Sequence, residues 1–130
     1  MNTKIVLFVL IITLLGLTSV AVFSVPIKVI DQVINYPNPF DSRTEQTVIS
    51  YMLDADARVK LEIYDLLGYK VKESSFYPGE PGGRKGVNRI AWNGENENGM
   101  KVAKGGYICR IYAEYRDTYA CAIRKIGVIH

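Results

Sequence analysis

The sequence predicts an all-β protein, an antiparallel β-sandwich of about seven strands. Charged and aliphatic residues alternate from Arg58 to Ile63, which is the period of two expected of a half-buried strand. No segment of the domain sustains an apolar period of 3.6 residues. Clusters of Gly, Pro, Asn and Asp separate short β-branched and aromatic runs at fairly regular spacing. Short strands separated by such turns are typical of a sandwich.

The strands can be placed in order along the chain. Asp65-Leu66-Leu67-Gly68 separates two alternating runs and predicts a hairpin in which Gly68 has a left-handed backbone. The segment 74–86 is rich in Pro and Gly, which predicts a loop. The expected strands are residues 27–34, 47–53, 58–63, 69–73, 87–92, 107–113 and 119–128.

Length and charge limit the classes of function. A chain of 130 residues with 48% hydrophobic residues forms one domain with a substantial core. Its net charge is +3, and basic and acidic residues are interleaved without a Lys/Arg run. Nucleic-acid binding therefore has no electrostatic basis in this sequence.

The N-terminus has the layout of an export signal. Lys4 precedes an apolar run over residues 5–17, and Ser19 and Ala21 fit a small-x-small cleavage site. We expect residues 1–24 to be a hydrophobic helix, either a signal peptide or an uncleaved membrane anchor, followed by a domain over residues 27–130. Either alternative delivers the domain to the periplasm, the cell surface or the medium, and contact with the membrane occurs only through an uncleaved N-terminus.

Two cysteines, Cys109 and Cys121, fall on the last two expected strands. A turn centred on Tyr115 places them opposite each other and permits a disulfide, whereas a turn centred on Arg116 and Asp117 offsets them by three positions and prevents it. The second turn has the more usual turn residues, and both possibilities remain open at this stage.

Two segments organise the predicted fold. In the first, Tyr36-Pro37-Asn38-Pro39-Phe40, the prolines make a rigid corner that Tyr36 and Phe40 pin to the core. The second is a crossover over residues 92–107, in which Trp92 and Tyr107 anchor the ends and two Asn-Gly pairs form tight turns. The residues that define the fold are Tyr36, Pro37, Pro39, Phe40, Tyr64, Gly68, Trp92, Gly94, Gly99, Gly105 and Tyr107.

These segments together resemble a known family. Tyr36-Pro37-Asn38-Pro39-Phe40, the Ile63–Gly68 hairpin, Trp92-Asn93-Gly94, Asn98-Gly99 and Val102-Ala103-x-Gly105-x-Tyr107 are similar to the immunoglobulin-like domain named after the flagellar hook-capping protein FlgD. The related C-terminal sorting domains of type IX secretion share the first two elements. The resemblance implies an immunoglobulin- or fibronectin-like sandwich in an exported bacterial protein, without catalytic activity, that acts as a spacer, attachment or export module.

Few residues suggest chemistry. The single histidine, His130, has no predicted partner, so a nucleophile–histidine pair is not expected. Glu95 and Glu97, with the neighbouring asparagines, offer oxygen ligands for calcium, but the spacing of an EF-hand is absent and solubilising loop charges are the preferred interpretation. We expect no cofactor, no metal site and no catalytic residue.

Tyrosines give the best indication of a binding face. Tyr112, Tyr115 and Tyr119 crowd the last hairpin, and strand alternation cannot bury all three. Such a face suits a protein partner or a carbohydrate. The sequence therefore favours an exported interaction module that binds a protein at the cell envelope. The alternatives are a sorting domain recognised by export machinery, and a carbohydrate- or calcium-binding adhesion module.

Overall fold

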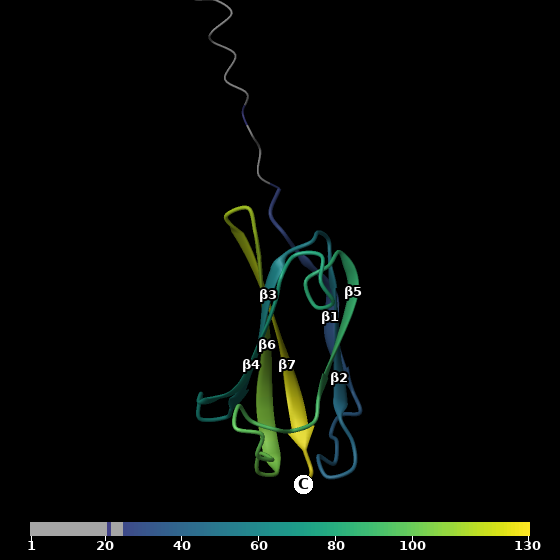
Figure 1. The fold of residues 1–130 in the computed structure, drawn as a ribbon, viewed down its shortest axis with the longest axis vertical. Coiled ribbons are helices and arrows are strands. Elements are labelled where there is room, and N and C mark those ends of the chain that lie inside the picture. Colours follow the sequence, from purple (N-terminus) through teal and green to yellow (C-terminus); the bar gives the residue numbers. More distant parts are fainter. Residues whose placement is uncertain (1–20, 22–24) are drawn as a thin grey trace, which may run out of the picture.

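The computed structural model describes Ala21 and residues 25–130, which form a sandwich of two antiparallel β-sheets (Figure 1). One sheet has the strand order β1-β2-β5 and the other has the order β4-β3-β6-β7. The all-β fold predicted from the alternation is confirmed. The expected N-terminal helix and its cleavage site lie outside the described residues, Ala21 excepted. The strands are β1 (Val29–Tyr36), β2 (Thr47–Leu53), β3 (Arg58–Asp65), β4 (Lys70–Phe76), β5 (Gly86–Trp92), β6 (Gly105–Tyr115) and β7 (Thr118–Val128).

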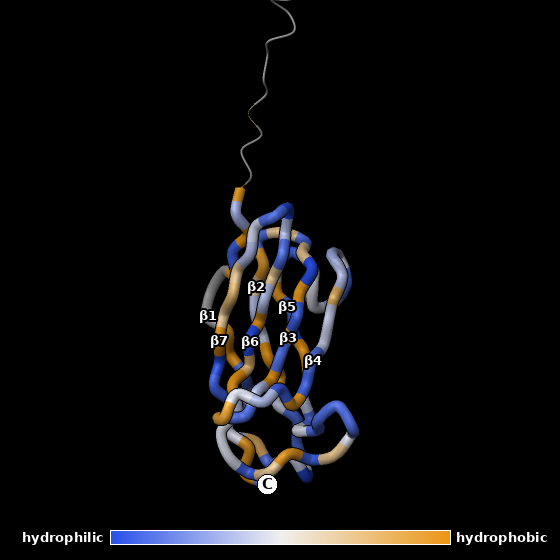
Figure 2. The backbone as a smooth tube through the Cα atoms, turned by 90° about the vertical axis from the view of Figure 1, so that its left-hand side faces the viewer, coloured by the Kyte–Doolittle hydropathy of each residue, from blue (hydrophilic) through white to orange (hydrophobic). Residues whose placement is uncertain are grey.

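The core lies between the sheets and is built by alternate residues of each strand. In β3, Val59, Leu61 and Ile63 point inward and are almost fully buried, as the alternation predicts. The inward residues of β6 include Cys109 and Ile111, which continue the same layer. Figure 2 shows the four-stranded sheet from its outer side, with β7 and β4 at its two edges.

The predicted strands are all present, and the differences concern their ends. The last hairpin is longer than expected, because Gly105 and Gly106 pair with Val128 and Gly127 and so belong to β6. β4 likewise extends to Phe76, into the segment predicted as loop. Gly68 has a φ of 92°, which confirms the left-handed position in the hairpin between β3 and β4.

The proline corner attaches β1 to β7, but through different residues from those predicted. Phe40 is fully buried, as expected, whereas Tyr36 is 81% exposed and does not pin the corner. Asn38 takes this part instead: its Nδ2 donates to the Lys125 carbonyl oxygen at 3.0 Å, and its Oδ1 accepts from the Gly127 amide at 2.8 Å. Tyr36 is the last residue of β1, where alternation directs its side chain to solvent.

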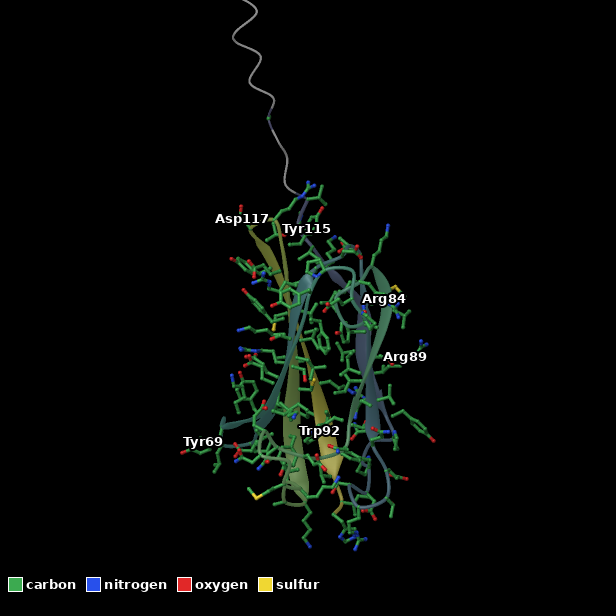
Figure 3. The ribbon with its side chains drawn as sticks, viewed as in Figure 1. Tyr69, Arg84, Arg89, Trp92, Tyr115 and Asp117 are labelled. Atoms are coloured by element: carbon green, nitrogen blue, oxygen red, sulfur yellow. The ribbon has the colours of Figure 1, made fainter. Side chains whose placement is uncertain are left out.

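The crossover after β5 has the predicted form. Trp92 packs edge-to-face on Phe40 and on Tyr107, with ring centroids 5.7 Å apart in each pair. Its Nε1 donates to the Glu95 carbonyl oxygen at 2.9 Å. Figure 3 places Trp92 between the two sheets, near the end of the sandwich where the chain finishes. Gly94 and Gly99 have φ angles of 80° and 75°, consistent with the turns predicted at the two Asn-Gly pairs, and Gly105, the first residue of β6, has a φ of 147°.

Candidate interaction face

Polar and aromatic side chains that do not belong to the core lie on the outer surface of the four-stranded sheet. The register places Arg110 between Glu62 of β3 and Ile123 of β7, and Tyr112 between Lys60 and Cys121. The β3 side of this surface is charged, while the β6 and β7 side is mostly aromatic and aliphatic. We call the second side the outer patch, and its members are Ile108, Tyr112, Tyr119, Cys121 and Ile123.

A charged pair marks the boundary of the outer patch. The Arg110 side chain donates to the Glu62 carboxylate twice, from Nε at 2.8 Å and from a terminal nitrogen at 2.6 Å. The same guanidinium lies over the Tyr64 ring, 5.4 Å from its centroid, and donates to the Tyr64 hydroxyl at 3.2 Å. The hydrogen bonds that Arg110 donates to Glu62 raise the pKa of Arg110 above its usual value. The pair therefore holds Arg110 in a fixed orientation on the surface.

Glu62 corrects one prediction. The alternation in β3 assigns it to an exposed charged face, yet only 6% of it is exposed. It does lie on the outer face, where Arg110 from the neighbouring strand covers it. The burial of Glu62 could have been predicted from its pairing with the oppositely charged Arg110. That pairing is known only once the register of β3 against β6 is known.

The tyrosines of the last hairpin divide between the two faces. Tyr112 and Tyr119 are diagonal neighbours on the outer face, with stacked rings whose centroids are 5.5 Å apart. Burial and the neighbouring Tyr119 raise the pKa of the Tyr112 hydroxyl. Tyr115 is an odd number of residues from Tyr112, so its side chain points to the inner face of the sheet and packs against the core. It is therefore not part of the predicted binding face. Its ring contacts the Arg116 guanidinium, 5.2 Å away.

A shallow hollow adjoins the outer patch at the β3–β4 hairpin. It measures about 570 Å³ and lies between that hairpin and strands β6 and β7. Leu66, which is exposed, and Arg110 both line it. The complete lining is Tyr64, Asp65, Leu66, Gly68, Ile108, Arg110 and Ile123.

The two cysteines are not bonded to each other. The hairpin turns at Arg116 and Asp117, so Cys109 faces Arg124 and Cys121 faces Tyr112. This is the register with the offset of three positions, and it excludes the disulfide that the alternative turn would permit. Cys109 is buried in the core, and burial raises its pKa to about 12. Cys121 is exposed in the outer patch.

The acidic residues of the crossover have partners within the chain. Glu95 lies 3.7 Å from the Lys101 ammonium. The Glu97 amide donates to the Val71 carbonyl oxygen at 3.1 Å, and its carboxylate accepts from the Glu73 amide at 2.5 Å. Glu97 therefore covers the outer edge of β4, a role that the interpretation as a loop charge missed. Within residues 25–130, the structure shows no group of three or more His, Cys, Asp or Glu side chains placed to hold a metal ion.

The described part of the chain contains no helix long and apolar enough to cross a membrane.

No family model matches the sequence, and no curated protein matches it.

Solved bacterial structures share the fold. Dimeric latent PorU from Porphyromonas gingivalis matches 82% of this chain with 22% identity and a TM-score of 0.65. PorZ from the same organism matches 75% with 22% identity and a TM-score of 0.50. Truncated FlgD from Helicobacter pylori matches 78% of this chain and 71% of its own, with 22% identity and a TM-score of 0.53. The matched regions are 10% of the PorU chain and 11% of the PorZ chain.

The likeness concerns the fold. It confirms the immunoglobulin-like sandwich of FlgD and type IX secretion proteins that the sequence resemblance implies.

Proposed function

We propose that this chain is an exported, non-catalytic immunoglobulin-like module that binds a protein partner at the bacterial cell envelope through the outer patch. The observation that carries the proposal is the composition of this patch. Ile123 is 63% exposed and Tyr119 is 57% exposed, side by side with the stacked Tyr112. Aromatic residues with an adjacent arginine are enriched where proteins bind one another, and Arg110 is held at the border of the patch.

A partner gains from the fixed orientation of these side chains. Tyr112 and Tyr119 restrict each other by stacking, and Arg110 is restricted by Glu62 and Tyr64. Binding then orders few additional rotamers, which lowers the entropic cost of association. The hollow beside Leu66 offers a place for an apolar side chain of the partner.

The envelope location is supported by the N-terminal export signature and by the kinds of protein that share the fold. PorZ is described as a bacterial surface component of the type IX secretion system. That description applies to PorZ, and we carry only the compartment over to this chain.

The non-catalytic role is supported by the positions of the buried polar residues. The Asn35 side chain donates a hydrogen bond to Thr47 of its own sheet and accepts one from Arg124 of the other sheet, so it joins the two sheets. Asn88 accepts from the Gly82 amide and donates to the carbonyl oxygens of Arg84 and Gly86. Among the described residues, every buried side-chain nitrogen and oxygen has a hydrogen-bond partner. These groups serve the fold, and we assign no catalytic residue.

Site-specific photocrosslinking tests the proposal. Benzoylphenylalanine in place of Tyr112 should form an adduct with an envelope protein in cells that express the full chain. The same amino acid in place of Tyr36 is the matched control, because Tyr36 is an exposed tyrosine on the other sheet. Adducts at both positions, or at neither, would contradict binding through the outer patch.

A sorting domain is the second candidate, favoured by the likeness to PorU and PorZ. Fractionation with N- and C-terminal sequencing separates the two functions. A module retains residues 27–130 at its destination, whereas a sorting domain is removed after export.

A further inference from the structure

β5 is an edge strand of the three-stranded sheet. It pairs with β2 alone, and β2 separates it from β1. The amide of Asp54, the residue after β2, donates to the Lys28 carbonyl oxygen at 3.3 Å, so the backbone of Asp54 points toward β1. Every second residue of β2 points the same way, because the register of β2 against β5 has no break. The intervening residues, which include Tyr51 and Leu53, therefore exchange hydrogen bonds with β5.

This alternation determines which backbone groups of β5 point away from the sheet. The β5 residues opposite the intervening residues of β2 are Gly86, Asn88, Ile90 and Trp92. The other three, Val87, Arg89 and Ala91, direct their amide and carbonyl groups outward. Among the residues that the structure describes, none hydrogen-bonds these outward groups. The side chains of the same three residues are exposed on the outer face of the sheet.

A strand added to β5 would lie opposite β4. β1 lies beside β7 at the other edge of the sandwich, and Figure 2 shows β5 behind β3, with β4 extending beyond it. Lys72 and Ser74 of β4 face inward, because their cross-strand partners are the core residues Ile63 and Leu61. Both are only half-buried, since the three-stranded sheet has no strand over them. An additional strand on β5 would therefore cover β4 and meet polar side chains there.

Arg89 is the middle residue of this edge, and no acidic side chain neutralises it. β2 and β5 contain no acidic residue, and the cross-strand neighbour of Arg89 is Ser50. Within the described part of the chain its guanidinium has no hydrogen-bond or ion-pair partner, and Figure 3 shows it pointing away from the sandwich. Val87 and Ala91 flank it on the same face. Such an edge is a template for a strand in which an acidic residue lies between two apolar ones.

We propose that β5 binds an extended segment of another protein, which pairs antiparallel with it and places a Glu or Asp opposite Arg89. Apolar residues of the segment, two positions to each side, lie opposite Val87 and Ala91, and the residues between them face Ser74 of β4. This surface is separate from the outer patch, because it belongs to the three-stranded sheet. Tyr36 of β1 lies three strand spacings, about 14 Å, from the bound segment, so photocrosslinking at Tyr36 does not report on it.

Arg89 disfavours a second copy of this chain as the occupant of the edge. Two-fold pairing of β5 with itself about Arg89 places two arginines opposite each other, and like charges directly opposite destabilise a sheet. The neighbouring symmetric registers place Arg89 opposite Val87 or Ala91 and leave its charge unpaired. An acidic segment supplies both the backbone pairing and the opposite charge.

NMR titration of the isotope-labelled full chain with the peptide acetyl-Ser-Val-Thr-Glu-Thr-Val-Ser-amide tests the proposal. We expect the largest amide shifts at Val87, Arg89 and Ala91. Arg89→Glu should weaken binding about tenfold, because an attractive cross-strand pair becomes repulsive, and should instead favour the same peptide with Lys in place of Glu. Lys125→Glu is the matched control: it changes the net charge equally, on β7, and should bind like the wild type. Absence of shifts at millimolar peptide, or equal weakening by the two variants, would overturn the proposal.

N-methylation of the peptide tests the backbone pairing without changing the protein. In the antiparallel arrangement the amide of the peptide's Glu faces β5, and the amide of the Thr that follows faces away. Methylating the Glu nitrogen should weaken binding at least about tenfold, because it removes a donor and blocks the edge, whereas methylating the Thr nitrogen should have a much smaller effect. Equal effects of the two methyl groups would contradict strand pairing at β5. Circular dichroism confirms that each protein variant is folded before affinities are compared.

Discussion

Trp92→Ala is the change that tests how the crossover closes the sandwich. Trp92 is 4% exposed and contacts Phe40 and Tyr107 edge-to-face, and its Nε1 donates to the Glu95 carbonyl oxygen. Truncating a buried Trp to Ala costs about 3–5 kcal/mol, which includes the cavity left behind. The two ring contacts and the hydrogen bond place the expected loss in the upper half of this range, about 4–5 kcal/mol.

Trp92→Phe separates packing from the hydrogen bond. It keeps an aromatic ring between Phe40 and Tyr107 but removes the donor to Glu95, so we expect a loss of about 1–2 kcal/mol. Urea unfolding followed by far-ultraviolet circular dichroism measures both variants without relying on tryptophan fluorescence. A loss below about 2 kcal/mol for Trp92→Ala, or equal losses for the two variants, would refute the argument that Trp92 anchors the crossover.

Three further predictions concern the corner, one carboxylate and the cysteines. Asn38→Ala should lower the free energy of unfolding by about 2–3 kcal/mol, because it removes the hydrogen bonds that attach the corner to β7; a change below about 0.5 kcal/mol in urea unfolding would contradict this. Asp41 should titrate at about 2, because side-chain hydrogen bonds from Arg43 hold its pKa below the usual value. This contribution to stability is present above the ordinary pKa of 3.8 and is lost as the pH falls toward 2. Carboxyl NMR should show the low value in the wild type and a return toward 3.8 in Arg43→Ala, and identical titrations would count against the pair. Ellman's reagent should modify Cys121 in the folded protein and Cys109 only after unfolding, so two thiols that react equally fast in native buffer would be inconsistent with the buried position of Cys109.

The sequence predicted those parts of the fold that depend on local pattern. Alternation in β3 placed Val59, Leu61 and Ile63 in the core, and the Asn-Gly pairs identified turns at Gly94 and Gly99. Both signals act within a few residues, where side-chain direction and backbone φ are set by the local chain.

The candidate site was only partly predictable. Crowding of tyrosines in the last hairpin indicated a binding face, and Tyr112 and Tyr119 do meet there. Tyr115 was predicted on that face as well, but strand alternation, counted from the turn at Arg116 and Asp117, directs its side chain inward. The outer patch also needs Ile108 and Ile123, and nothing in their immediate neighbours distinguishes them from core residues of the same strands.

By itself, the sequence determined the fold class, the turns and the inward side of the regular strands, because these follow from side-chain period and backbone preference. Only the tertiary structure decided which residues of different strands lie opposite each other. Register buries Glu62 beneath Arg110, separates Cys109 from Cys121 and brings Asn38 to Gly127. Each of these depends on pairing between residues distant in the chain, and a shift by one residue would exchange the inner and outer faces of a strand.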